Sequence, residues 1–200
     1  VLKRVASTLK HGDLQLSSEA CFHPQSIVDI VQERITRLQS VEESYPELKL
    51  FLNEHCNPLL QKIIQWSQAH CSRFQISWDQ EIYRTLSPSD FGFHNALKRS
   101  NSEIVFLDLE YFGWDDPAKI ICDFLFHPAT SVSHQLKQYF VSKMCEIFSD
   151  YSQLEKKIEM IYPLIGLNWC LRLLNEFLSE HLLRRTFASV TDTDHEQVRS

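Results

Sequence analysis

The sequence runs Asp90-Phe91-Gly92-Phe93-His94-Asn95 and, thirteen residues after Asn95, Asp108-Leu109-Glu110-Tyr111. Between these two motifs, residues 96–98 and 104–109 have the composition of short strands, and the polar residues 99–103 are typical of a hairpin turn. The stretch therefore predicts a small β-hairpin with polar side chains at both of its ends.

Helices are predicted on both sides of this hairpin. Ile27, Val31, Ile35 and Leu38 recur at the spacing of one buried helix face. Further helices are expected to begin at Pro46, at the N-cap and proline pair Asn57-Pro58 and at a second such pair, Asp116-Pro117. Helices are also expected over 134–149, 153–162 and 164–183. A strand is expected at 82–85 and a frayed tail at 187–200. The fold class expected is therefore α+β, mainly α, as one unit over residues 1–200. The segment 164–183 is apolar on most sides, which predicts a buried central helix.

Composition and charge narrow the class of protein. A formal net charge of −6 argues against a general nucleic-acid binder, because such proteins need clustered Lys and Arg. Six cysteines are spread widely with no Cys-x-x-Cys pair, which favours reduced thiols in a cytoplasmic protein. No apolar run approaches the ~20 residues needed to span a bilayer, so no membrane association is expected.

The polar residues at the ends of the hairpin suit phosphoryl transfer. A catalytic base must lie beside an attacking hydroxyl, and Asp90, in a loop after a strand, is placed for that role. Asn95 offers a neutral oxygen ligand for Mg²⁺, and Asp108 offers a carboxylate at the end of an apolar strand. Strand periodicity predicts that Asp108 and Glu110 share one side, where two carboxylates favour a nearby cation. The alternative is that Asp and Asn are here only as turn residues.

With these residues in place, the segment Leu86–Phe126 resembles the aminoglycoside phosphotransferase and choline kinase superfamily. The resemblance implies the C-terminal lobe of a protein-kinase-like fold, with catalytic and metal loops over 86–117. It implies that ATP donates its γ-phosphate, with Mg²⁺, to a hydroxyl group of a small molecule. By position, Asp90 resembles the base, Asn95 and Asp108 the Mg²⁺ ligands, and Asp123 a buried carboxylate that supports the catalytic loop.

Three features depart from the pattern of that superfamily. Pro88 and Ser89 precede Asp90 where the superfamily usually has His-Gly, and His94 stands where a smaller residue is commoner. No glycine-rich loop and no strand-borne Lys precede Asp90. The N-terminal lobe is therefore expected to be absent from these residues and present in the full-length chain, and these 200 residues alone are expected to be a poor enzyme.

Substrate-binding candidates are weaker. Glu110 is one by resemblance to the choline-kinase-like branch. Trp114 and Asp115 follow the metal motif and suit a cationic amine through cation–π and charge attraction; for aromatic residues on buried helices, such as Trp169, core packing is the more ordinary role. The acceptor stays open among choline-like, aminoglycoside-like and sugar molecules. Two other functions also stay open: a pseudokinase-like binding module without turnover, and a helical interaction domain.

Overall fold

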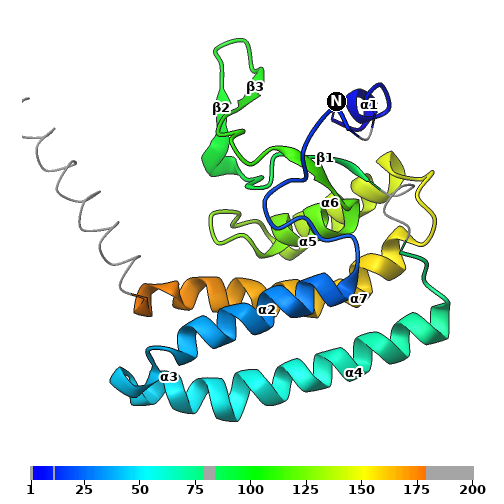
Figure 1. Cartoon of the computed structure of the whole chain (residues 1–200). Helices are drawn as coiled ribbons and strands as arrows, with labels where there is room; N and C mark the ends of the chain where they lie inside the picture. Colours follow the sequence, from blue (N-terminus) through cyan, green and yellow to red (C-terminus); the bar gives the residue numbers. More distant parts are fainter. Residues whose placement is uncertain (1, 11, 79–83, 179–200) are drawn as a thin grey trace, which may run out of the picture.

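The computed structural model describes residues 2–10, 12–78 and 84–178. Helices come first, a small antiparallel β region follows, and further helices complete the chain (Figure 1). This order confirms the prediction of a mainly helical α+β chain. The helices are α1 (Leu2–Ala6), α2 (Pro24–Gln39), α3 (Pro46–Phe51), α4 (Asn57–Phe74), α5 (Pro117–Phe126), α6 (His134–Ile147) and α7 (Leu154–Leu173), with 3-10 turns η1 (Glu42–Ser44), η3 (Phe93–Asn95) and η4 (Leu174–Phe177) and a π-helical turn η2 (Leu52–Cys56).

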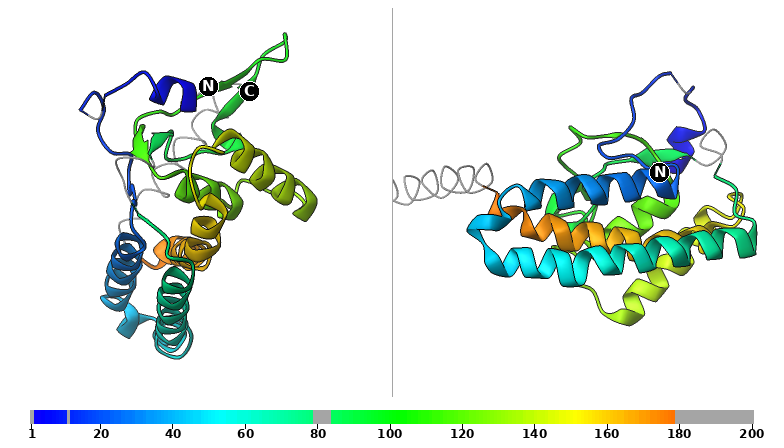
Figure 2. Two further views of the ribbon diagram at one scale, coloured as in Figure 1. Left: turned by 90° about the vertical axis from the view of Figure 1, so that its right-hand side faces the viewer. Right: turned by 60° about the horizontal axis from the view of Figure 1, so that its bottom comes forward.

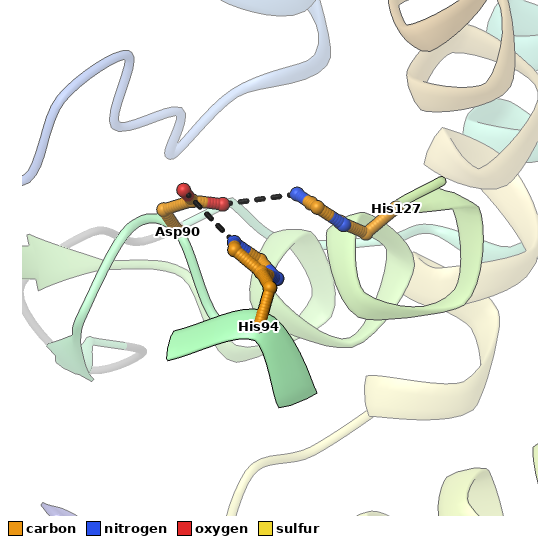
Figure 3. Close-up of side chains that lie close together, drawn as sticks. All are labelled: Asp90, His94 and His127. Carbon is orange, nitrogen blue, oxygen red and sulfur yellow. Dashed lines mark hydrogen bonds and ion pairs between the residues drawn. The ribbon is translucent and has the colours of Figure 1, made fainter. Parts of the chain in front are cut away.

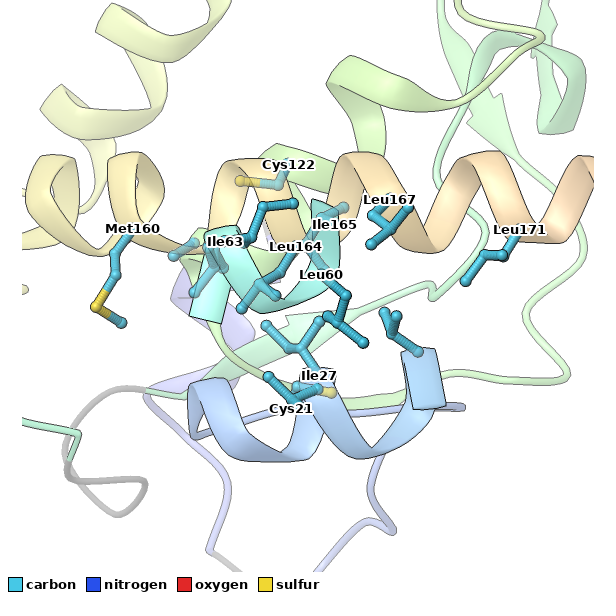
Figure 4. Close-up of a cluster of buried hydrophobic side chains, with 14 of the residues drawn as sticks. Cys21, Ile27, Leu60, Ile63, Cys122, Met160, Leu164, Ile165, Leu167 and Leu171 are labelled. Carbon is cyan, nitrogen blue, oxygen red and sulfur yellow. The ribbon is translucent and has the colours of Figure 1, made fainter. Parts of the chain in front are cut away.

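Helix α7 is the centre of the core. It packs against α5 and against α2 and α4, as the views in Figure 1 and Figure 2 show. Its inward residues meet side chains of α2, α4 and α5 in one continuous apolar cluster (Figure 4). Burial of that apolar surface is the main force that holds the helices together. The most deeply buried members from α7 are Met160, Ile161, Leu164, Ile165 and Leu171.

The prediction of two helices on either side of Pro163 is wrong, because α7 continues through the proline. A proline inside a helix removes one backbone donor, here the one that would reach the carbonyl of Glu159. The side chain of Glu159 is half-exposed, so this face of the helix is open to water. Apolar neighbours on both sides of Pro163 are buried, and their packing outweighs the local penalty.

Helices α3 and α4 are continuous in the chain, because the π-helical turn η2 joins them directly. Asn57 has helical backbone angles of φ −62° and ψ −47°, so its predicted role as an N-cap is wrong. By contrast, Asp116 is an N-cap as predicted: its side chain accepts a hydrogen bond from the backbone N–H of Ala118 at 2.7 Å. The predicted helix over 27–38 is confirmed within α2.

Two antiparallel strand pairs make up the β region. Strand β1 (Thr85–Ser87) pairs with β4 (Gly113–Asp115), and β2 (Ala96–Lys98) pairs with β3 (Ile104–Phe106). The bounds of β2 are those predicted. The strand predicted over 104–109 ends earlier, at Phe106, because Asp108 has a left-handed backbone (φ 54°). The strand predicted at 82–85 lies largely outside the described residues, as does the tail at 187–200.

All six cysteines are free thiols, and three of them, Cys21, Cys56 and Cys122, are buried. This agrees with the prediction of reduced thiols. None of the described helices is both long enough and apolar enough to cross a membrane.

Candidate functional site

A tight turn after β1 presents Asp90. Ser89 has a left-handed backbone (φ 65°), and its N–H donates to the hydroxyl oxygen of Ser87 at 3.0 Å. The N–H of Asp90 then donates to the carbonyl of Pro88 at 2.8 Å. Pro88 and Ser89 therefore form a compact turn that directs the backbone at Asp90 away from strand β1.

The aromatic neighbours of Asp90 anchor the loop. The ring of Phe91 lies 5.1 Å from the ring of Phe106 on β3 and 5.4 Å from the ring of Phe124 on α5, measured between centroids. These contacts fix the loop between the hairpin and α5. The Asp90 side chain stays 41% exposed, so it remains open to a reactant.

Three donors surround the Asp90 carboxylate, and two of them, His94 and His127, are drawn in Figure 3. The Nε2 atom of His127 lies 3.0 Å from Oδ1, and Nε2 of His94 lies 3.2 Å from Oδ2. The Nδ2 amide of Asn95 donates to Oδ2 at 3.2 Å and to the Asp90 carbonyl at 3.1 Å. Burial tends to raise the pKa of Asp90, but the hydrogen bonds and charge of His94, together with His127 and Asn95, hold that pKa below its ordinary value. Asp90 is therefore an ionised carboxylate at neutral pH.

The register of the β2–β3 hairpin places Leu107, the residue before Asp108, beside Asn95. Ala96 pairs with Phe106, and the N–H of Leu107 donates to the carbonyl of Asn95 at 2.8 Å. Asp108 follows directly and is exposed. Because the strand has ended, Asp108 and Glu110 do not share a strand face, and that prediction is wrong. Glu110 is exposed in the turn that follows.

Trp114 and Asp115 lie in the interior. Trp114 is 2% exposed and Asp115 is 0% exposed. Asp115 accepts hydrogen bonds from the Ser17 hydroxyl at 2.9 Å and from the N–H of Cys21 at 3.1 Å, so it ties the N-terminal segment to β4. Their position gives no support to a substrate-binding role, because no side-chain surface of either residue is open in this structure. Charged residues are seldom buried unless they are paired, and Asp115 is paired: its Oδ2 lies 3.2 Å from Nζ of Lys119.

Asp123 lies behind the site on α5. Lys119 Nζ is 2.8 Å from Asp123 Oδ2, and the indole N–H of Trp169 on α7 donates to Asp123 Oδ1 at 3.0 Å. The Trp169 ring in turn packs edge-on against His127, with 4.8 Å between centroids. Asp123 thus reaches the loop of Asp90 through Trp169 and His127, and no described contact joins it to Asp90 directly.

Sequence reasoning missed His94 and His127 as site residues. His94 follows Asp90 by four residues, and that spacing was a usable signal. His127 carries no such signal, because the sequence indicates only the end of a helix before Pro128. Its place beside Asp90 results from the packing of α5 against the loop.

Two sets of residues at this end of the hairpin are potential metal ligands. Asn95 and Asp108 offer oxygen atoms, which suit Mg²⁺. Asp90, His94 and His127 offer one oxygen and two nitrogen atoms that all lie within 4.8 Å of one another, a set that suits softer ions such as Zn²⁺. A groove of about 960 Å³ lies elsewhere and is lined mainly by residues of α6 and α7.

Comparison with protein-family models, with curated protein sequences and with solved structures returned no match.

Proposed function

We propose that this chain carries the acceptor-activating and metal-binding residues of a phosphotransferase that moves the γ-phosphate of ATP to a hydroxyl of a small molecule. The observation that carries the proposal is the Asp90 carboxylate, which is ionised, half-exposed and fixed by donors on both oxygens. A base of this kind needs access to the reactant together with a fixed direction, and Asp90 combines both.

The proposed reaction balances without a redox partner. Asp90 accepts the proton of the acceptor hydroxyl as its oxygen attacks the γ-phosphorus. A new P–O bond to the acceptor forms while the bond between the γ-phosphorus and the β,γ-bridging oxygen breaks, and ADP leaves with that electron pair. An ionised carboxylate carries two oxygens with about four lone-pair sites. Three described donors occupy three of them, which leaves one for the substrate hydroxyl.

Asn95 and Asp108 fit the ion that this chemistry needs. Both supply oxygen atoms, and the β2–β3 register sets Asp108 one residue beyond the backbone partner of Asn95. Among the described residues, Asp108 forms no ion pair that would compete for a cation. Bound Mg²⁺ would neutralise charge on the phosphate groups. Asn95 also holds Asp90 through its amide nitrogen, which leaves its carbonyl oxygen for the ion.

The nucleotide needs further contacts. Glycine-rich backbone and a strand-borne Lys are the usual means of holding ATP phosphates in kinase-like enzymes. The described residues before Asp90 are mostly helical. We therefore place the nucleotide-covering lobe outside these 200 residues, and expect low turnover from them in isolation.

ATP consumption by the full-length protein, with a panel of alcohol acceptors, tests this function. Asp90→Ala removes the base, and Asp108→Asn removes one metal-ligand charge while keeping the side-chain size. Asp90→Ala should reduce phosphotransfer at least a hundredfold, since general base catalysis alone contributes roughly 10²–10⁴-fold. Asp108→Asn should also reduce it, because the ligand that would hold Mg²⁺ loses its charge. Wild-type turnover in either variant would refute the assignment.

One observation favours a second function, a module that binds nucleotide or a small molecule without turnover. Asp90 is engaged by three protein donors, as in a carboxylate with a purely structural role. Such a module would gain about 2.7 kcal/mol of stability at a hundredfold excess of ligand over the dissociation constant, yet consume no ATP. A helical interaction domain would show neither effect. Thermal unfolding with and without Mg²⁺-ATP, measured beside turnover, separates the three.

A further inference from the structure

We propose that His127 is a neutral hydrogen-bond donor that orients the Asp90 carboxylate, and that it is neither a metal ligand nor a cation. This rests on the proposed function in one respect only: Asp90 must be the base for its orientation to matter to a reaction. The assignment of the ring itself is independent of any activity.

The contacts of both ring nitrogens fix the state of His127. The backbone N–H of Ala129 donates to Nδ1 at 3.1 Å, so Nδ1 must carry a lone pair rather than a hydrogen. Nε2 faces Asp90 Oδ1 at 3.0 Å. Since a neutral imidazole has one N–H, that hydrogen must be on Nε2 and must point at the carboxylate. Rotating the ring by half a turn would place carbon atoms at both contacts, so the orientation is fixed as well.

The same contact argues against a metal at this position. A histidine that binds metal through Nε2 normally donates its Nδ1–H to an acceptor. Here Nδ1 meets a backbone donor, so a metal on Nε2 would require either two opposed N–H groups or an imidazolate. The cluster of Asp90, His94 and His127 therefore has the composition of a zinc site but the hydrogen bonding of a carboxylate clamp.

Aromatic packing holds the ring in place. His94 stacks on His127 with 4.4 Å between centroids and an angle of 10° between planes. Trp169 contacts the ring edge-on from α7, and its own indole N–H is held by Asp123 at 3.0 Å. The His127 side chain is 14% exposed, against 41% for Asp90, so the donor is anchored while the base is open.

The clamp also identifies the reactive oxygen. Asp90 Oδ2 receives two described donors, from His94 and Asn95, whereas Oδ1 receives only His127. Oδ1 therefore keeps the lone pair that accepts the substrate proton. His127 is a positioning residue that acts through that atom.

Two nearly isosteric substitutions separate the two ring contacts. His127→Gln places an amide nitrogen near the position of Nε2 and can still donate to Asp90. His127→Asn reaches only the position of Nδ1, so it can satisfy Ala129 but cannot reach Asp90. His23→Asn is the matched control, because the N–H of Gln25 donates to its Nδ1 at 3.1 Å, in another His-Pro turn that has no contact with Asp90.

Steady-state kinetics of the full-length protein give the first readout. We expect His127→Asn to lower kcat by about tenfold to a hundredfold, since misplacing a catalytic group by 1 Å costs about that much. The KM for ATP should stay within about twofold, because the changed contact is to the base. His127→Gln should retain kcat within about threefold, and His23→Asn should match wild type. Equal kcat in the Gln and Asn variants would overturn the proposal.

Nitrogen NMR of the protein labelled with 15N-histidine gives a readout that needs no activity. The nine histidines of these 200 residues each contribute signals, and the set lost in His127→Gln belongs to His127. We expect that set to report a protonated Nε2 and an unprotonated Nδ1 at pH 7. A protonated Nδ1, or stoichiometric binding of added Zn²⁺ that His127→Gln abolishes, would overturn the assignment. If Asp90→Ala leaves turnover unchanged while the tautomer is as stated, the proposed function has failed and the ring assignment stands.

Discussion

Lys119→Met tests the buried charge cluster behind the Asp90 loop. The Lys119 side chain is 6% exposed, and its ammonium lies 3.2 Å from Asp115 and 2.8 Å from Asp123. Burial alone would lower the pKa of Lys119, but the two carboxylates hold it above its ordinary value. Methionine fits a similar volume without the charge, so the substitution leaves the buried Asp115 and the partly buried Asp123 with no cation between them.

The expected loss is large because Asp115 cannot reach water and Asp123 reaches it only in part. Asp115 keeps its donors from Ser17 and Cys21, but its side chain is only 1% exposed. Removing one partner of a buried ion pair typically costs about 3–5 kcal/mol. For a chain of this length, each kcal/mol lowers the melting temperature by roughly 2–4 °C, so Lys119→Met should melt about 6–20 °C below wild type.

Urea unfolding followed by tryptophan fluorescence measures this loss. Lys156→Met is the matched control, since its ion pair with Glu159 lies at the surface and such pairs contribute about 0–1 kcal/mol. Adding Asp123→Asn to Lys119→Met removes one unpaired charge while an amide oxygen can still accept from Trp169. The double variant should therefore be more stable than Lys119→Met alone. A loss below 1 kcal/mol in Lys119→Met, or a double variant that is less stable still, would refute this reasoning.

Three further predictions concern packing, thiols and pH. Gly113→Ala should destabilise the fold by about 1–3 kcal/mol or more, because an added Cβ would lie 2.5 Å from backbone atoms of residues 15–17. The control Gly12→Ala places its Cβ where nothing lies within 4 Å, so it should be close to neutral in the same urea assay. Iodoacetamide should modify the exposed Cys170 first and the buried thiols only on unfolding, as detected by mass spectrometry. The reason is that burial raises the pKa of Cys21 to about 12 and that of Cys56 to about 11. Early modification of Cys21 or Cys56 would contradict their burial. Burial lowers the pKa of His127 below its ordinary 6.5, so the unfolded chain takes up the proton first and stability falls as pH drops below about 6.5. Thermal unfolding should therefore show a larger loss between pH 7 and pH 5 for wild type than for His127→Gln, and equal losses would contradict a neutral His127.

Local sequence signals predicted the parts of the fold that local chemistry decides. The polar run 99–103 set the limits of β2 and of the turn, and Asp116-Pro117 marked the start of α5. The same kind of rule failed at Pro163, where tertiary packing on both sides keeps α7 continuous. It also failed at Asn57, where the preceding chain is already helical.

The candidate site was predictable where its residues are close in sequence. Asp90 and Asn95 lie in one loop, and their contact follows from that spacing. Asp115 was expected near a substrate because it follows the metal motif and could attract a cationic amine. Its burial depends on Ser17 and Cys21, which lie 98 and 94 residues away. His127 and Trp169 likewise meet the loop only because α5 and α7 pack together, and no spacing in the sequence encodes that contact.

The proposed function depends above all on Asp90 as the proton acceptor in phosphoryl transfer. Its most direct test is the rate of ADP formation by the full-length protein and by Asp90→Asn, at saturating Mg²⁺-ATP and acceptor. The amide keeps one acceptor oxygen, so it can accept from His127 or from His94 but not from both, and it cannot take the substrate proton. We expect the variant to form ADP about a hundredfold more slowly or slower still, with nucleotide affinity unchanged. An Asp90→Asn variant that forms ADP at the wild-type rate would contradict the proposed function.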